Sequence, residues 1–237
     1  VQRTLQCLLR EGVPIKPLAI LLEAIADYAP KGYSPEQLAE RLRSHIDRTI
    51  IRRLRDAIGR LNPKTILEFG GGIGYRSAWL MDLFESPDLQ PESYTIVEEG
   101  SRFGIIIKRL LDRYKAESWA RVVVGDPLIM LGEVKAWMAA GKPDDDPPLP
   151  PSCDCIIVDT SPEKQLSLLD SALSLLSKEG VLFTFEPPVP VGELEENDPS
   201  VIDFNAWIAW VKNIQQTHHL AFTPLHEGTL VTLMSKA

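Results

Sequence analysis

Hydrophobic and polar positions follow two different patterns along the chain, and the change falls near residue 63. Within the first fifty residues, apolar side chains recur every three or four positions, which is typical of amphipathic helices. We expect three such helices, at residues 1–12, 15–29 and 33–46. The third has a clear start, because Ser34 can cap a helix and Pro35 suits its first turn. A further, arginine-rich helix is expected at residues 48–60.

After residue 63, short apolar runs alternate with amphipathic segments. The apolar runs predict five buried strands, at residues 64–69, 93–99, 120–126, 153–159 and 180–186. The other segments predict helices at residues 77–85, 103–115, 127–140, 163–177 and 201–216. This alternation favours a doubly wound α/β fold with a mostly parallel sheet, closed by an antiparallel hairpin at residues 220–236. We therefore expect a helical appendage at residues 1–50 and an α/β domain at residues 51–237.

Composition narrows the class of protein. The 237 residues carry a formal net charge of −8, and 44% of them are hydrophobic, which is enough to bury a core. Residues 1–60 hold 11 Lys/Arg against 7 Asp/Glu, whereas the rest of the chain holds 14 against 26. So acidic a domain is a poor surface for nucleic acid, whose phosphates need a basic footprint. No apolar run approaches the roughly 20 residues of a membrane span.

The three cysteines, Cys7, Cys153 and Cys155, do not make a disulfide framework, so a reduced, cytoplasmic setting is expected. Cys153 and Cys155 flank Asp154 at the start of a predicted strand, where alternate residues share one face. A zinc site would need a second cluster of cysteine or histidine ligands. Packing of the two thiols on one face of the strand is therefore the expected role.

The densest chemical signal is "ILEFGGGIGYRS", residues 66–77, in which four glycines follow an apolar strand and one acid. Glycine lets the backbone turn tightly and lets a ligand approach, and the helix start beyond it offers free N–H groups to an anion. The dinucleotide pattern G-x-G-x-x-G fails in every register, because a larger residue always falls on a required glycine. The pattern that fits is acid-x-G-x-G-x-G, from Glu68 to Gly74. A glycine-rich turn without a ligand is the alternative.

This spacing resembles motif I of class I S-adenosylmethionine-dependent methyltransferases, and later segments follow that family in order. The resemblance implies a Rossmann-like sheet of strand order 3-2-1-4-5-7-6, S-adenosylmethionine as cofactor, and a small-molecule or protein methyl acceptor. Glu98, at the end of the second strand, would accept hydrogen bonds from the ribose, and Asp126, after the third, would contact the adenine. The cofactor-binding residues implied are Glu68, Gly70, Gly72, Gly74, Tyr75, Ser77, Glu98 and Asp126. A Rossmann-type dehydrogenase would account for Glu98 but not for the hairpin.

Within that family, residues 70–80 and 156–182 resemble the catechol and caffeoyl-type O-methyltransferases. The resemblance to this branch covers roughly residues 50–237. The branch holds a divalent metal, such as magnesium, through carboxylates at the ends of strands four and five, and a lysine helps to remove the acceptor's proton. The positions implied here are Asp159 and Glu186 for the metal, and Asp159 and Lys164 for catalysis.

The sequence departs from this branch in the catalytic half of the site. Pro162 stands where the lysine is expected, and Lys164 lies two residues further on. Arg76 stands where a serine is usual, although Ser77 is adjacent. Metal binding stays open against a simpler reading, in which Asp159 caps a turn and the acid after the fifth strand is a surface residue.

Residues 1–50 resemble a helical subdomain from the cytoplasmic part of the flagellar and type III secretion export-gate family, on segments such as "LLREGVPI" and "ADYAPK". That region docks export chaperones and substrates, so the resemblance implies flagellar or secretion proteins as partners. The alternative is that these helices cover the sheet or build a homodimer interface. Two functions follow: an O-methyltransferase-like enzyme, or a catalytically degenerate cofactor-binding module in secretion assembly. The intact glycine loop, Glu98 and Asp126 favour retained cofactor binding, whereas Pro162 and the segment "FEPP" favour lost or altered chemistry. Of the two functions we expect the enzyme.

Overall fold

The structure is a computed structural model of the 237-residue chain. It describes residues 3–6, 25–26, 30, 32–141, 146–192, 195–225 and 228–236. The helices expected at residues 1–12 and 15–29 fall mostly outside these ranges. Among the helices of the described part, none combines the length and the apolar character that crossing a membrane requires.

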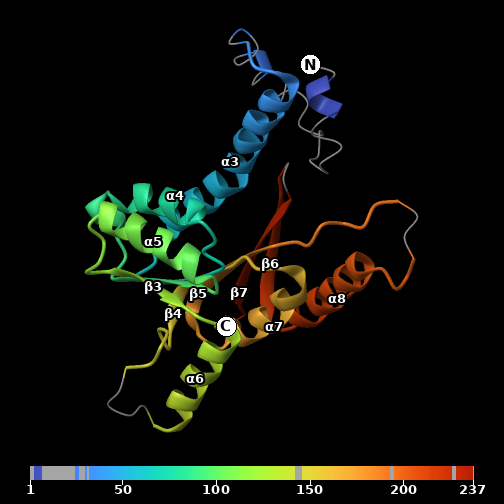
Figure 1. The fold of residues 1–237 in the computed structure, drawn as a ribbon. Helices are drawn as coiled ribbons and strands as arrows, with labels where there is room; N and C mark the ends of the chain where they lie inside the picture. Colours follow the sequence, from blue (N-terminus) through green and yellow to red (C-terminus); the bar gives the residue numbers. More distant parts are fainter. Residues whose placement is uncertain are drawn as a thin grey trace.

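A seven-stranded sheet forms the centre of the molecule, with strand order β3-β2-β1-β4-β5-β7-β6 (Figure 1). Its strands are β1 (Thr65–Phe69), β2 (Ser93–Glu98), β3 (Ala120–Val124), β4 (Cys153–Val158), β5 (Leu176–Phe185), β6 (His218–Pro224) and β7 (Thr229–Ser235). Strands β1 to β5 pair in parallel, and β7 runs antiparallel to both β5 and β6. The predicted α/β class, strand order and closing hairpin are thereby confirmed.

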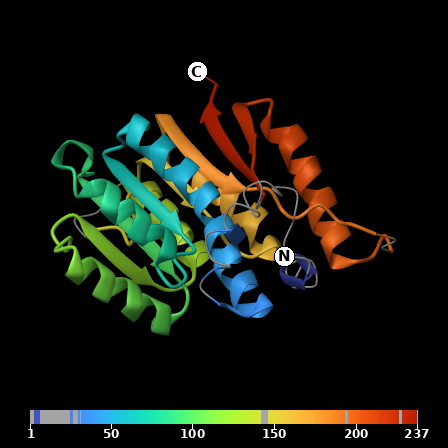
Figure 2. The ribbon, with the colours of Figure 1, turned by 90° about the horizontal axis from the view of Figure 1, so that it is seen from above.

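Helices cover both faces of this sheet, and from residue 32 on the described part of the chain places three α-helices on each face (Figures 1 and 2). They are α3 (Pro35–Leu61), α4 (Tyr75–Phe84) and α5 (Ser101–Arg113) on one face, and α6 (Pro127–Ala139), α7 (Pro162–Leu173) and α8 (Pro199–Ile214) on the other, with a short 3-10 helix η2 (Pro87–Leu89). Each face has its own apolar core: Ile58 and Phe84 lie in the first, Leu168 and Trp207 in the second. Burial of these side chains is the main favourable term that holds the layers together.

Helix α3 runs without a break and joins two helices that the sequence pattern separated near residue 47. Nothing ends a helix there, because residues 46–48 include neither glycine nor proline. Its start is as predicted: the Ser34 hydroxyl accepts from the Gln37 N–H (3.2 Å), and the Gln37 side chain accepts from the Ser34 N–H (3.0 Å). Near its end, Leu54 and Ile58 are fully buried. The helix therefore continues through the predicted division between residues 50 and 51 into the core of the sheet domain.

Strand β4 overturns the expectation that Cys153 and Cys155 share a face. Cys153 lies in the core beneath α6, α7 and α8, and Cys155 lies in the core on the opposite face. The pairing with β5 is irregular between these two residues, and a bulge of one residue moves the following side chains to the other face. Burial raises the pKa of the Cys153 thiol to about 12, so this thiol stays protonated and packs as a small apolar group.

Candidate functional site

A cleft of about 230 Å³ opens at the carboxyl edge of the sheet. Its lining includes Gly70, Glu98, Glu99, Asp159, Thr160 and Lys164. The strand order reverses at this place, because β2 lies on one side of β1 and β4 lies on the other. Open α/β sheets bind their ligands at such points. The fold therefore brings three segments named from the sequence, the loop after β1 and the ends of β2 and β4, to one cleft.

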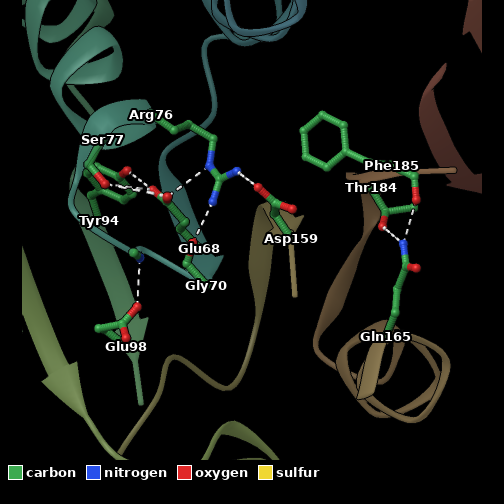
Figure 3. Close-up of polar contacts among 11 residues, drawn as sticks. Glu68, Gly70, Arg76, Ser77, Tyr94, Glu98, Asp159, Gln165, Thr184 and Phe185 are labelled. Carbon is green, nitrogen blue, oxygen red and sulfur yellow. Dashed lines mark hydrogen bonds and ion pairs between the residues drawn. The ribbon is translucent and has the colours of Figure 1, made fainter. Parts of the chain in front are cut away.

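Glu68 of β1 lies beneath the cleft, and its side chain is 0% exposed (Figure 3). The carboxylate accepts hydrogen bonds from the Tyr94 hydroxyl and from the Ser77 hydroxyl, the latter at 3.3 and 3.4 Å. A buried charge is costly unless it is paired and hydrogen-bonded, and these donors meet that need. Burial and the adjacent Glu68 charge raise the pKa of Tyr94 well above its ordinary value, so Tyr94 stays a neutral donor. Glu68, predicted as a cofactor contact, is placed as an anchor for the loop.

Arg76, the second residue of α4, completes this buried network and links three segments (Figure 3). Its Nε donates to Glu68 at 2.9 Å, one terminal nitrogen donates to the Gly70 carbonyl at 2.8 Å, and the other donates to the Asp159 carboxylate. Burial alone would lower the pKa of Arg76, but the Glu68 and Asp159 charges outweigh burial and raise it. The guanidinium is therefore a permanent cation that ties the glycine loop to the end of β4.

Gly70 and Gly72 have different roles in the loop. A Cβ on Gly70 would lie 1.8 Å from the Asp159 carbonyl oxygen, so the close contact between the loop and β4 excludes any side chain. Its φ of +82° also lies in the region that favours glycine. Gly72 has a φ of +54°, but a Cβ there would meet nothing within 4 Å. Gly70 is therefore needed where the loop packs against the end of β4, whereas Gly72 borders open space.

Glu98, at the end of β2, is held by the backbone of its own chain. One carboxylate oxygen accepts from the Gly72 N–H at 2.6 Å, and the other accepts from the Gly100 N–H at 2.8 Å. The side chain lines the cleft although the residue is only 8% exposed. A carboxylate offers about four lone-pair positions, so two remain for hydroxyl donors of a ligand. This arrangement suits the ribose contact that the sequence predicted.

The remaining predicted cofactor residues occupy distinct places. Asp126 caps α6: its Oδ1 accepts from the N–H groups of Leu128 and Ile129, at 2.8 and 3.2 Å. Its contact with an adenine stays a prediction. Tyr75 begins α4 and is 39% exposed, whereas Ser77 is fully buried against the carboxylate of β1. A Ser77 contact with a cofactor would therefore have to act through that carboxylate.

The wall formed by β4 and α7 is more open than the glycine loop. The Asp159 side chain is 49% exposed, and its partner is the buried Arg76. The Lys164 ammonium lies 2.9 and 2.8 Å from the two carboxylate oxygens of Glu99, which follows β2. The predicted catalytic lysine therefore forms an exposed ion pair with Glu99, between segments that both line the cleft.

The residues of this wall do not fit a divalent metal. Magnesium and calcium ions need several converging oxygen ligands. Within the described ranges, no group of three His, Cys, Asp or Glu side chains is placed to hold an ion. One oxygen of Asp159 already accepts from the Arg76 cation, whose charge would oppose a metal beside it. Asp159 and Glu186 therefore lack the ligand set that the resemblance implied.

Two buried polar contacts were not expected from the sequence. The sequence marked Arg76 only as a departure from a family pattern, whereas the fold makes it the centre of the network. Gln165 of α7 is 5% exposed, and its amide donates to the Thr184 hydroxyl (3.0 Å) and the Phe185 carbonyl (2.5 Å) at the end of β5 (Figure 3). The sequence carries no local sign of the Gln165 contact, because this residue follows Glu163 and Lys164 in the first turns of its helix.

Comparison with known proteins gives one match for the N-terminal segment and others that cover most of the chain. The model of the FHIPEP family matches residues 1–68 of the 237. This match confirms the resemblance of the N-terminal segment, and it extends through α3 into β1. No curated protein sequence matches the chain.

Solved structures of similar fold cover most of the chain. A Staphylococcus aureus protein, provisionally assigned as a caffeoyl-CoA O-methyltransferase, has a TM-score of 0.63 at 19% identity, with 91% of this chain and 99% of that chain covered. A Bacillus cereus O-methyltransferase in complex with SAH has a TM-score of 0.57 at 16% identity, covering 92% and 91%. TomG, the Streptomyces achromogenes O-methyltransferase involved in tomaymycin synthesis, solved with SAM, has a TM-score of 0.57 at 15% identity, covering 92% and 90%. The chain thus has the Rossmann-like α/β fold of these O-methyltransferases.

Proposed function

We propose that this protein is an S-adenosylmethionine-dependent methyltransferase of the O-methyltransferase type, with an acceptor still to be identified. The observation that carries the proposal is the paired arrangement of the glycine loop and Glu98. The Gly72 N–H and the Gly100 N–H fix the Glu98 carboxylate on the wall of the cleft. A carboxylate held in this way can bind two vicinal ribose hydroxyls without reorganising, which lowers the cost of binding.

The cleft also suits the other end of such a cofactor. S-adenosylmethionine supplies a methyl group on a sulfonium, for in-line transfer to a nucleophile. Its positive charges can face the Glu98 carboxylate, which lines the cleft and has only backbone N–H groups as partners, whereas Glu99 and Asp159 are already paired with Lys164 and Arg76. Its carboxylate fits the free N–H groups at the start of α4. The Thr160 hydroxyl oxygen is buried at the cleft and makes no hydrogen bond within the described residues, so a ligand could satisfy it.

The chain's own residues supply positioning more than acid–base chemistry in this proposal. The network of Glu68, Arg76 and Asp159 keeps the loop and the end of β4 in one geometry, as methyl transfer requires. Cofactors named for proteins of the same fold support the choice, since the B. cereus enzyme was solved with SAH and TomG with SAM.

Calorimetric titration of the purified chain with S-adenosylmethionine, S-adenosylhomocysteine and, separately, NADH tests this function. We expect 1:1 binding of the first two, with Kd values in the roughly micromolar to millimolar range usual for enzyme substrates. NADH should not bind, because the glycine pattern fails the dinucleotide spacing. If neither sulfur compound binds, the proposal is wrong; if only NADH binds, the dehydrogenase alternative is right.

A second role, a secretion-linked module that binds the cofactor without catalysis, has one observation in its favour: the FHIPEP match at residues 1–68. Docking of flagellar or secretion proteins through residues 1–50 belongs to this alternative. It predicts cofactor binding without label transfer from methyl-labelled S-adenosylmethionine to any fraction of a cell extract. Label transfer to a small molecule or a protein favours the enzyme.

A further inference from the structure

The contacts of Arg76 have a consequence beyond holding the loop. Each of its three side-chain nitrogens donates to an acceptor in a different segment: Glu68 in β1, the Gly70 carbonyl in the loop, and Asp159 after β4. Its side chain is 8% exposed, compared with 49% for Asp159. The cation is therefore enclosed by the protein, while the carboxylate that it holds reaches the cleft.

This arrangement places a fixed positive charge where the O-methyltransferase resemblance implied a metal ion. A guanidinium is always charged, and its planar donors orient a carboxylate more strictly than a point charge does. The oxygen of Asp159 that bonds Arg76 is no longer free to take up a hard cation. Within the described ranges, the acidic and histidine side chains supply no set of three ligands that could compensate.

We infer that Arg76 is the resident cation of this site, and that the protein binds its cofactor and transfers methyl groups without a divalent metal. The inference rests on the proposed function for the methyl transfer but not for the absence of metal binding. Arg76 acts as a positioning residue: it holds the Asp159 carboxylate at the cleft and the Gly70 carbonyl beside it. Both residues line the cleft, and the exposed Asp159 carboxylate can accept hydrogen bonds from a bound ligand.

Two measurements on the unaltered protein test the absence of metal. Electron paramagnetic resonance should detect no stoichiometric Mn²⁺ binding that disappears in Asp159→Asn. The affinity for S-adenosylmethionine should be the same, within a factor of about two, in excess MgCl₂ and in EDTA, far below the tenfold change that 1.4 kcal/mol represents. Stoichiometric Mn²⁺ binding lost in Asp159→Asn, or an affinity that needs Mg²⁺, overturns the inference even if the cofactor binds.

A set of variants tests the positioning role. Arg76→Gln should weaken S-adenosylmethionine binding about 10- to 100-fold, as loss of hydrogen bonds to charged groups does. Arg76→Lys keeps the charge but not the three separate donors, so it should recover only part of that loss, whereas a role in packing alone would gain nothing from the charge. Arg121→Gln is the matched control, since Arg121 also bonds two partners, Thr95 and Pro148, but lies at the far end of β3. The affinity of Arg121→Gln for S-adenosylmethionine should equal that of the wild type.

The outcomes of these variants separate the inference from the proposed function. Near-ultraviolet circular dichroism establishes whether Arg76→Gln folds; if it does not, Arg76→Lys and the Mn²⁺ measurement still decide the question. Affinities of both Arg76 variants equal to that of the wild type overturn the positioning role. Failure of the unaltered protein to bind S-adenosylmethionine overturns the proposed function, but it leaves the Mn²⁺ measurement as a test of the resident cation.

Discussion

The two walls of the cleft are built in opposite ways. On the side of β1 and β2, Glu68 and Glu98 are 0% and 8% exposed, and donors of their own chain satisfy both carboxylates. On the side of β4 and α7, the side chains of Asp159 and Lys164 are 49% and 43% exposed. The difference follows from solvation, because a buried charge requires its partners whereas water can replace the partners of an exposed one.

The same contrast separates the two halves of the pattern that the sequence resembles. Glu68, Arg76, Ser77 and Tyr94 form one buried network, so a change at one of them leaves a partner unsatisfied. On the exposed wall, a residue such as Lys164 can be exchanged at little cost to the fold, because water solvates its partner, whereas Asp159 is tied to the buried Arg76. The contrast predicts a graded series of effects, from replacements in the packed wall to replacements in the open one.

The largest effect is expected at Gly70. Gly70→Ala would place a Cβ 1.8 Å from the Asp159 carbonyl oxygen at a φ of +82°, so the loop or β4 must move. We expect the free energy of unfolding to fall by on the order of 3 kcal/mol, from backbone strain together with overpacking. Urea denaturation followed by circular dichroism measures it. Gly132→Ala in α6, where a Cβ meets nothing within 4 Å, should instead stabilise by about 0.5–1 kcal/mol. A similar response of both variants would contradict the packing argument.

Gly72→Val should leave a folded protein that no longer binds S-adenosylmethionine. A Cβ there meets nothing within 4 Å, so the branched side chain would extend into the space in front of the loop, at a φ of +54° that adds local strain. Calorimetry should find no binding, while circular dichroism remains native. Gly141→Val is the control, because Gly141 has a comparable φ of +83° and equally open surroundings beyond α6. Unchanged affinity in Gly72→Val would remove the loop from the cofactor site.

Tyr94→Phe should cost about 1–3 kcal/mol, because it removes a donor to the buried Glu68 carboxylate. Since folding raises the pKa of Tyr94, the folded protein keeps this proton at a pH where the unfolded chain has lost it. The Tyr94 contribution is therefore complete below a pH of about 10 and declines above it. Urea denaturation from pH 8 to roughly pH 11 should show the difference in unfolding free energy between wild type and Tyr94→Phe shrinking at the alkaline end.

The control is Tyr114→Phe, which removes an exposed hydrogen bond to Asp82 and should change the free energy of unfolding by less than about 0.5 kcal/mol. Equal losses in the two variants would mean that burial does not govern these bonds.

The smallest effect is expected at Lys164. Lys164→Gln breaks the exposed ion pair with Glu99, whose attraction raises the pKa of Lys164. The urea midpoint should not change measurably, because water solvates both groups once they separate. A loss as large as that of Tyr94→Phe would show that the open wall is as tightly coupled as the packed one.

The sequence by itself determined the framework of this protein. Alternating apolar runs and amphipathic segments predicted the parallel sheet, and Ser34 followed by Gln37 marked the start of α3, because such patterns express local chemistry. The spacing from Glu68 to Gly74 located the loop at the carboxyl edge, where the cleft opens. These features depend on neighbours within a few positions, so they can be read along the chain.

Only the tertiary structure decided how the charges pair. Arg76 and Asp159 are 83 positions apart, and Tyr94 and Glu68 are 26 apart, so no local pattern records either contact. The same holds for Cys153 and Cys155, which a bulge sends to opposite cores. Partners of this kind are set by strand order and register, which are fixed when the whole sheet closes around its cores. Local sequence patterns therefore determine the helices, the strands and the glycine loop, whereas the pairing of charges in the site depends on packing across the fold.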